Sequence, residues 1–112
     1  MVSMEGIAQE CATFYTASNI GAGSPCKMVA KLAVAPCNDG DDFFGIAIKR
    51  EGTLCSVIFR GFVTLPYSGA TPSYGFTGLA ADGAGGVKVS STAVKRLVVA
   101  IDSSSKTLTL LL

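Results

Sequence analysis

The chain contains no histidine and no tryptophan, and charged residues make up only 15 % of its 112 positions. Without histidine it lacks the usual general base, the usual partner of a catalytic cysteine and the commonest metal ligand. Lysine plus arginine (9) nearly balance aspartate plus glutamate (8), and no basic run is present that could neutralise a phosphate backbone. We therefore expect neither histidine-based catalysis nor a direct nucleic-acid ligand.

Long apolar runs and paired cysteines are also missing. No uninterrupted apolar run approaches the roughly 18 residues of a membrane span, and no cationic start precedes an apolar segment as in a secretory leader. We expect a chain that is made in the cytosol and has no membrane segment. Its four cysteines, Cys11, Cys26, Cys37 and Cys55, show no C-x-x-C spacing. The sequence predicts free thiols, with Cys26 and Cys55 as small buried hydrophobic residues.

Three segments look superficially like sites. Residues 38–42 gather carboxylates but lack the spaced twelve-residue pattern of a calcium loop, so a solvated turn is the better interpretation. The glycines of 21–25 and 82–86 precede no helix that could hold a phosphate. Ser105 and Lys106 are the best hydrolase-like pair, but neighbouring strand positions point to opposite sides. We expect no catalytic residue, metal site or cofactor, and place an enzyme third among the possible functions.

Hydrophobic residues, 49 % of the chain, fall mostly in short runs of the β type. The most prominent runs, 43–48 and 54–65, are rich in β-branched and aromatic residues and flank the polar break 49–52. They predict a long β-hairpin. Pro66 has no N–H for a ladder and is expected to end the second arm. Apolar residues occupy both faces of that arm, so we expect it to be covered on both sides.

Shorter runs of the same kind surround this hairpin, and none has the 3.6-residue period of a helix. Residues 1–10 show neither period and are expected to form a flexible N-terminal arm. The sequence predicts one all-β domain over 11–112, a small β-barrel or β-sandwich of about eight short strands. Besides the hairpin, we predict strands at 11–17, 27–29, 32–35, 78–81, 87–90, 95–101 and 107–112.

A faint internal repeat is visible in this pattern. Ala47 begins a hairpin whose pattern returns 53 residues later at Ala100, and a short alternating strand precedes each hairpin, at 32–34 and 87–89. A duplicated β-hairpin unit and a chance resemblance between β-rich segments both account for it.

Three aromatic residues, Tyr67, Tyr74 and Phe76, border the proline-containing loop 68–73. Exposed aromatic side chains on a loop are plausible binding anchors. The alternative is that they pack as a lid over one end of the barrel. All three are candidate interface residues.

Arg60 is the other unusual residue, because it lies in the middle of a predicted strand and shares its face with Ile58 and Phe62. A charge in such surroundings needs a carboxylate, a carbonyl or a subunit boundary. We therefore add Arg60 and Phe62 to the candidate interface, and expect the chain to self-associate.

Four segments in order carry a resemblance to a known group: "FFGIAIKREG", "VIFRGFVTLPYSG", "GLAADGAGGVKVS" and the terminal "LVVAIDSSSKTLTLLL". Over residues 21–112 the chain resembles the small all-β capsid decoration, or head-stabilising, proteins of tailed phages and prophages. The resemblance implies a protein on the capsid exterior of the virion, made in the bacterial cytoplasm. It also implies binding to the major capsid protein, often as a trimer, and stabilisation without chemistry.

Two functions therefore remain from the sequence. The first is a structural virion protein that oligomerises and clamps neighbouring capsid subunits through buried area and avidity. The second is a small β-barrel module that recognises a glycan or small ligand through the aromatic loop 67–76.

Overall fold

The computed structural model describes residues 9–16 and 19–112, which form strands and turns and contain no helix. The all-β prediction is confirmed. This part of the chain accordingly offers no helix long and apolar enough to cross a membrane. The strands within it are β1 Glu10–Thr16, β2 Pro25–Ala30, β3 Ala33–Pro36, β4 Gly45–Glu51, β5 Leu54–Arg60, β6 Phe62–Ser68, β7 Gly75–Ala81, β8 Val87–Val89, β9 Lys95–Asp102 and β10 Thr107–Leu111.

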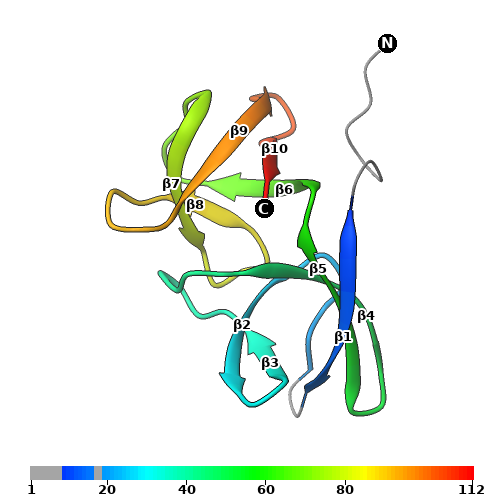
Figure 1. Ribbon diagram of the computed structural model, residues 1–112. Helices are drawn as coiled ribbons and strands as arrows, with labels where there is room; N and C mark the ends of the chain where they lie inside the picture. The colour runs from blue at the N-terminus through cyan, green and yellow to red at the C-terminus, as the bar shows by residue number, and fades with distance from the viewer. Residues whose placement is uncertain (1–8, 17–18) are drawn as a thin grey trace.

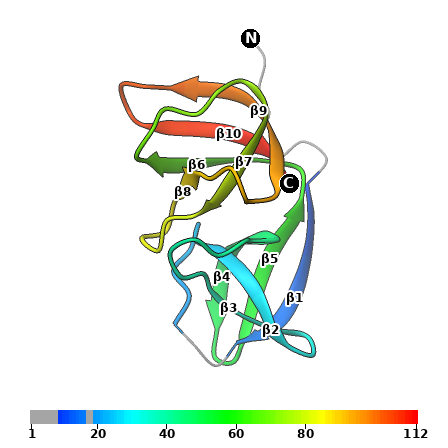
Figure 2. The same ribbon diagram turned by 90° about the vertical axis from the view of Figure 1, so that its left-hand side faces the viewer.

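The strands close into two barrels of five strands each, with orders β1-β3-β2-β4-β5 and β10-β6-β8-β7-β9. Figures 1 and 2 show the two barrels one above the other. The chain thus forms the small all-β barrel architecture that the sequence predicts, with ten strands in two barrels where about eight strands were expected. The predicted arm at 1–10 lies almost wholly outside the described residues; of it, Gln9 and Glu10 are described, and Glu10 already begins β1.

The two barrels repeat the same topology. In each, the first and third strands are parallel, and the other neighbouring pairs are antiparallel. Each hairpin formed by the fourth and fifth strands carries a bulge, which leaves Ile48 unpaired in the first barrel and Val99 in the second. The structural repeat is thus a whole barrel rather than a hairpin. The two bulges align Ala47 with Val98. The sequence pattern had aligned Ala47 with Ala100, two positions further along the chain.

The predicted long second arm, 54–65, is broken at Gly61. Residues before Gly61 belong to β5 in the first barrel, and residues after it belong to β6 in the second. Gly61 has a φ of 116°, which a side chain bearing a Cβ rarely adopts. Its carbonyl accepts a hydrogen bond from the Leu112 N–H at 2.9 Å, which holds the end of the chain against the junction.

The expectation that this arm is covered on both sides holds only in part, because Ile58 is half-buried against the second core but Thr64 on the same face is exposed. Cys55 and Val57 are buried in the first barrel, and Val63 and Leu65 in the second, whereas Thr64 between them is exposed. The alternation therefore continues through the break at Gly61, and one face of both strands supplies the cores.

Pro66 does not end the strand, because β6 continues to Ser68. The N–H of Tyr67 donates to the Lys106 carbonyl in the strand-end pairing at 3.0 Å. Successive residues of a strand direct these groups to opposite sides, so the nitrogen of Pro66 faces away from β10 and no ladder bond is lost. Pairing with β8 on the other side begins only at Tyr67.

Each barrel has its own apolar core, but the larger core is shared. The smaller cluster in the first barrel includes Cys26, Val34 and Val57. The cluster in the second barrel contains Phe43 and Ile46, which come from the first repeat. The two barrels therefore bury side chains against each other.

Gly61→Ala should destabilise the protein by about 1–3 kcal/mol, because alanine at this φ is strained. A thermal melt measures the loss. Gly21→Ala is the control, since Gly21 is also a glycine outside the cores but is exposed and has no positive φ. A Gly61→Ala melting temperature no lower than that of Gly21→Ala would contradict the strained junction.

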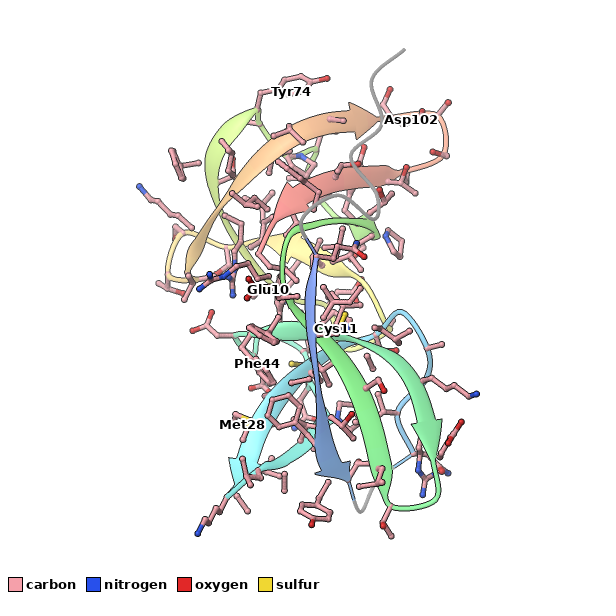
Figure 3. The ribbon with its side chains drawn as sticks, turned by 45° about the vertical axis from the view of Figure 1, so that its right-hand side comes forward. Glu10, Cys11, Met28, Phe44, Tyr74 and Asp102 are labelled. Carbon is pink, nitrogen blue, oxygen red and sulfur yellow. The ribbon has the colours of Figure 1, made fainter. Side chains whose placement is uncertain are left out.

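The four cysteines are free thiols, as predicted from their spacing. Burial raises the pKa of Cys26 to about 12 and that of Cys37 to about 11, and it also raises the pKa of Cys55. Cys11 is exposed on β1 (Figure 3). Thiolates are the reactive form, so Cys11 should react fastest with a disulfide reagent near neutral pH.

We expect one fast thiol in the native protein, its loss in Cys11→Ser, and four thiols after denaturation without reductant. A fast phase that persists in Cys11→Ser would show that another cysteine is accessible.

Candidate interaction surface

Residues 37–44, between β3 and β4, join the two barrels. The Gly40 N–H donates to the Ala81 carbonyl at 2.8 Å, and the Ala81 N–H donates to the Asp41 carbonyl at 2.9 Å. This segment, which we call the clasp, therefore adds a short stretch of main chain to the end of β7. Its interpretation as a solvated turn located the turn correctly but missed this contact. No group of three or more potential metal-ligating side chains is present among the described residues.

Charged side chains fix the clasp in place. Asp39 pairs with Lys88 of β8 at 2.6 Å, and the Asp42 carboxylate accepts the Val94 N–H at 3.3 Å. Asp41 pairs with Lys27 at 2.6 Å and accepts the Asn38 N–H, and these two bonds hold the pKa of Asp41 below its usual range. The clasp thus combines main-chain pairing with ion pairs.

Phe43 anchors the clasp in the second barrel. Its ring is 3 % exposed, and the Arg96 guanidinium lies 5.1 Å from the ring centre. Arg96 also donates a hydrogen bond to the Phe43 carbonyl. A cation over an aromatic face adds about 1 kcal/mol to the contact. Phe43, which belongs to the first repeat, therefore closes the core of the second barrel.

Away from the clasp, large apolar side chains gather at the free end of the first barrel. Tyr15 pairs with Leu54 across β1 and β5, and the Tyr15 N–H donates to the Leu32 carbonyl at 2.8 Å. Figure 3 shows Met28 on β2 of the same barrel, and this side chain also lines the cleft toward Val94 and Arg96. We call this surface the tip patch. Its exposed members are Tyr15, Met28, Val29, Leu32 and Leu54.

The opposite end of the molecule carries exposed aromatic side chains. Tyr74 and Phe76, at the start of β7, are 66 % and 74 % exposed, and Figure 3 shows Tyr74 at the far end from Met28. We call these two residues the aromatic pair. A pair of large exposed rings is typical of a contact surface for another molecule.

The structure divides the residues that the sequence selected. Tyr67 lies in the core of the second barrel at 6 % exposure, as the packing alternative expected, and is not available as a surface contact. Phe62 is half-buried beside the junction, where its carbonyl accepts the Gln9 side-chain N–H at 2.9 Å. Tyr74 and Phe76 lie together at the start of β7, whereas Arg60 and Phe62 flank Gly61.

Arg60 is in a different environment from the one expected. Its side chain is 67 % exposed, and its nearest carboxylate is Glu10 of β1, 3.8 Å away. It therefore does not carry the desolvation cost of a charge inside an apolar sheet. The tip patch, by contrast, was not predicted; the signal was the near-absence of polar side chains at 28–30 and 32–36 in two short strands joined by a tight turn.

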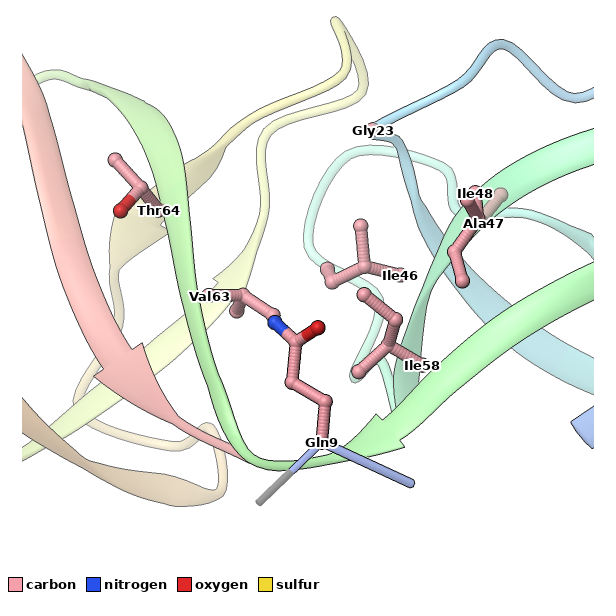
Figure 4. A pocket seen from close by; sticks show the side chains of 8 residues that line it. All are labelled: Gln9, Gly23, Ile46, Ala47, Ile48, Ile58, Val63 and Thr64. Carbon is pink, nitrogen blue, oxygen red and sulfur yellow. The ribbon is translucent and has the colours of Figure 1, made fainter. Parts of the chain in front are cut away.

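A groove of about 400 Å³ lies between the barrels (Figure 4). Its walls are mainly aliphatic and come from β4, β5 and β6, with Ile46, Ile58 and Val63 among them, and Gln9 crosses one side. The described residues that line it carry no ionisable side chain. This groove can hold an apolar group, but it offers no acid, base or nucleophile of its own.

Comparison with known proteins does not assign a family. No protein-family model matches the chain, and no curated protein matches it significantly. The function has to be argued from the exposed surfaces.

Arg60→Ala should lower stability by no more than about 0.5 kcal/mol, because an exposed, loosely spaced ion pair contributes little. If Arg60 lies at a subunit or capsid boundary, the same variant should weaken assembly clearly more than it lowers the melting temperature. Glu10→Ala is the control, since it breaks the same ion pair and keeps the arginine. A large loss of melting temperature with unchanged sedimentation would remove Arg60 from the interface.

Proposed function

We propose that this chain is a non-catalytic structural protein of a phage virion that binds the outer surface of the capsid and stabilises it. Its partner is the major capsid protein, and it acts as a homo-oligomer, with a trimer favoured. The resemblance of residues 21–112 to capsid decoration proteins supports this proposal. The distribution of apolar surface on the double barrel supports it independently.

The observation that carries the proposal is the pair of exposed apolar surfaces at opposite ends of the molecule. The tip patch lies on the first barrel and the aromatic pair on the second. Side chains of this size are costly to leave in water, and clusters of them mark contact surfaces. Two such surfaces allow one protein to contact two neighbours at once.

The shared core explains how such contacts stabilise a capsid. Phe43 and Ile46 of the first repeat pack in the core of the second barrel, so the two ends are held at a fixed spacing within a molecule that is 36 Å along its longest axis. A rigid link between two sites adds avidity, and binding only to the assembled shell stabilises that shell by mass action. No bond has to be made or broken.

Co-sedimentation with capsids assembled from the major capsid protein of the virus that carries this gene tests this function. Phe76→Ser should weaken capsid binding by about tenfold or more. The capsid would bury the exposed phenyl ring, and losing that burial costs at least about 1.4 kcal/mol of binding free energy. Ile48→Ser is the control, since Ile48 is also exposed but lies in the groove between the barrels. Both variants should melt close to the wild type.

A glycan- or small-ligand-binding module is the alternative, and the aromatic pair favours it to the extent that exposed rings can stack on sugars. It predicts no capsid binding and a rise in melting temperature with a carbohydrate that Phe76→Ser abolishes. Absence of capsid binding by the wild type, with such a shift, would replace the virion proposal.

A further inference from the structure

The ladder between β2 and β4 stops before β2 does. Pro25 pairs with Ile46 and Cys26 with Gly45, and continuing this antiparallel register would bring Met28 opposite Phe43. Phe43 cannot take that place, because it is buried in the core of the second barrel. β2 nevertheless continues to Ala30. The docking of Phe43 therefore leaves the edge of β2 without a strand partner at Met28.

The main chain of Met28 faces the gap that results. On this side of β2 the Ser24 carbonyl accepts the Ala47 N–H at 2.9 Å, and the Cys26 carbonyl accepts the Phe44 N–H at 3.2 Å. Main-chain groups two residues apart in a strand point the same way, so the N–H and C=O of Met28 are next in this row. Within the described residues they have no main-chain partner on this side. An unpaired strand edge of this kind accepts an extended segment of another chain.

The gap opens into a cleft of about 510 Å³. Met28, Phe44 and Val94 give it apolar walls, and Figure 3 shows Met28 and Phe44 on the same side of the first barrel. Met28 and Val94 are about half exposed, at 46 % and 50 %. The cleft therefore places an apolar surface next to the free strand edge.

The charged side chains that line the cleft balance each other. They are two cations and two carboxylates, Lys27, Arg96, Asp41 and Asp42. Lys27 pairs with Asp41 at 2.6 Å, and the Asp42 carboxylate accepts the Val94 N–H at 3.3 Å. An occupant of this cleft therefore needs no charge of its own.

Arg96 has hydrogen-bond donors to spare at the cleft. A guanidinium carries five N–H groups, and within the described chain Arg96 donates only to the Phe43 carbonyl. Its Nε is buried without a partner, and no carboxylate of the described residues forms an ion pair with it. Half-buried donors without acceptors are costly, and a carbonyl oxygen in the cleft would satisfy them. The cleft thus offers main-chain pairing at one wall and a donor for a carbonyl at another.

We propose that an extended, uncharged segment of the major capsid protein binds in this cleft and pairs with the free edge of β2. The Met28 N–H donates to one carbonyl of the segment, the Met28 carbonyl accepts one of its N–H groups, and Arg96 donates to a second carbonyl. An apolar side chain of the segment packs between Phe44 and Val94. Met28 also belongs to the tip patch, so the cleft continues the surface that contacts the capsid in the proposed function, on which this inference rests.

Hydrogen exchange with and without capsids tests the main-chain contact. The Met28 amide should exchange fast in the protein alone and at least about tenfold more slowly on capsids, because a hydrogen-bonded amide exchanges only when its bond opens. Thr64 is the control. Its N–H also lies on a strand edge, since it points away from β10 before the pairing with β8 begins, but it borders the groove between the barrels. The Thr64 amide should exchange equally fast in both states.

Val94→Trp tests the cleft itself. The main chain of Val94 is already bonded, its N–H to Asp42 and its carbonyl to the Leu79 N–H, so the larger ring fills the cleft without disturbing these bonds. We expect about tenfold weaker capsid binding, because the apolar contact and the edge pairing are both blocked. The Met28 protection should be lost, and the melting temperature should stay close to that of the wild type. Val89→Trp is the matched control, since Val89 is 38 % exposed on β8 and is not among the residues that line the cleft.

The outcomes separate this contact from the proposed function. If the wild type binds capsids but its Met28 amide stays fast, or if Val94→Trp binds and protects Met28 as the wild type does, the inference fails and the proposed function stands. If the wild type does not bind capsids, both fail. Protection of Met28 in the purified protein would assign the cleft to a second copy of the chain and would also overturn the inference. Should Val94→Trp melt lower than the wild type, the exchange of the wild-type Met28 amide alone decides.

Discussion

The docking of the clasp on the second barrel is the interaction on which the rest of this structure depends. Two main-chain hydrogen bonds join Gly40 and Asp41 to Ala81, and Phe43 is buried beneath them. Without this contact, the two five-stranded barrels would be joined by the chain at Gly61 and by the packing of Ile46 and Ile58 against the second core. A barrel of about 50 residues buries a smaller fraction of its surface than a larger domain does, and it is marginally stable by itself. Sharing a core is the way in which this chain gains one stable unit from two small ones.

Local sequence patterns could predict the strands but not how they divide between barrels. The final hairpin was predicted at 95–101 and 107–112 and is found at Lys95–Asp102 and Thr107–Leu111, because alternation and turn residues act over a few positions. The split at Gly61 depends on a backbone angle, and its only signal was a glycine inside an apolar run. The clasp brings together residues about 40 positions apart, which no local period records.

The candidate surface was predictable only in part. Tyr67 shares the strand face of Val63 and Leu65, so the same alternation indicates its burial. The exposure of Tyr74 and Phe76 agrees with their place beside a loop. Arg60 was judged by its apolar neighbours, but the strand ends there and its side chain reaches solvent.

The central claim is that the clasp makes the two barrels one cooperative unit, and native-state hydrogen exchange tests it most directly. Slow amides in the two cores, such as those of Val57 and Leu110, should open with the same free energy, and Phe43→Ala should lower both equally, by about 3–5 kcal/mol. Different opening free energies in the two barrels, or a Phe43→Ala variant in which only the amides of the second barrel exchange faster, would contradict the account.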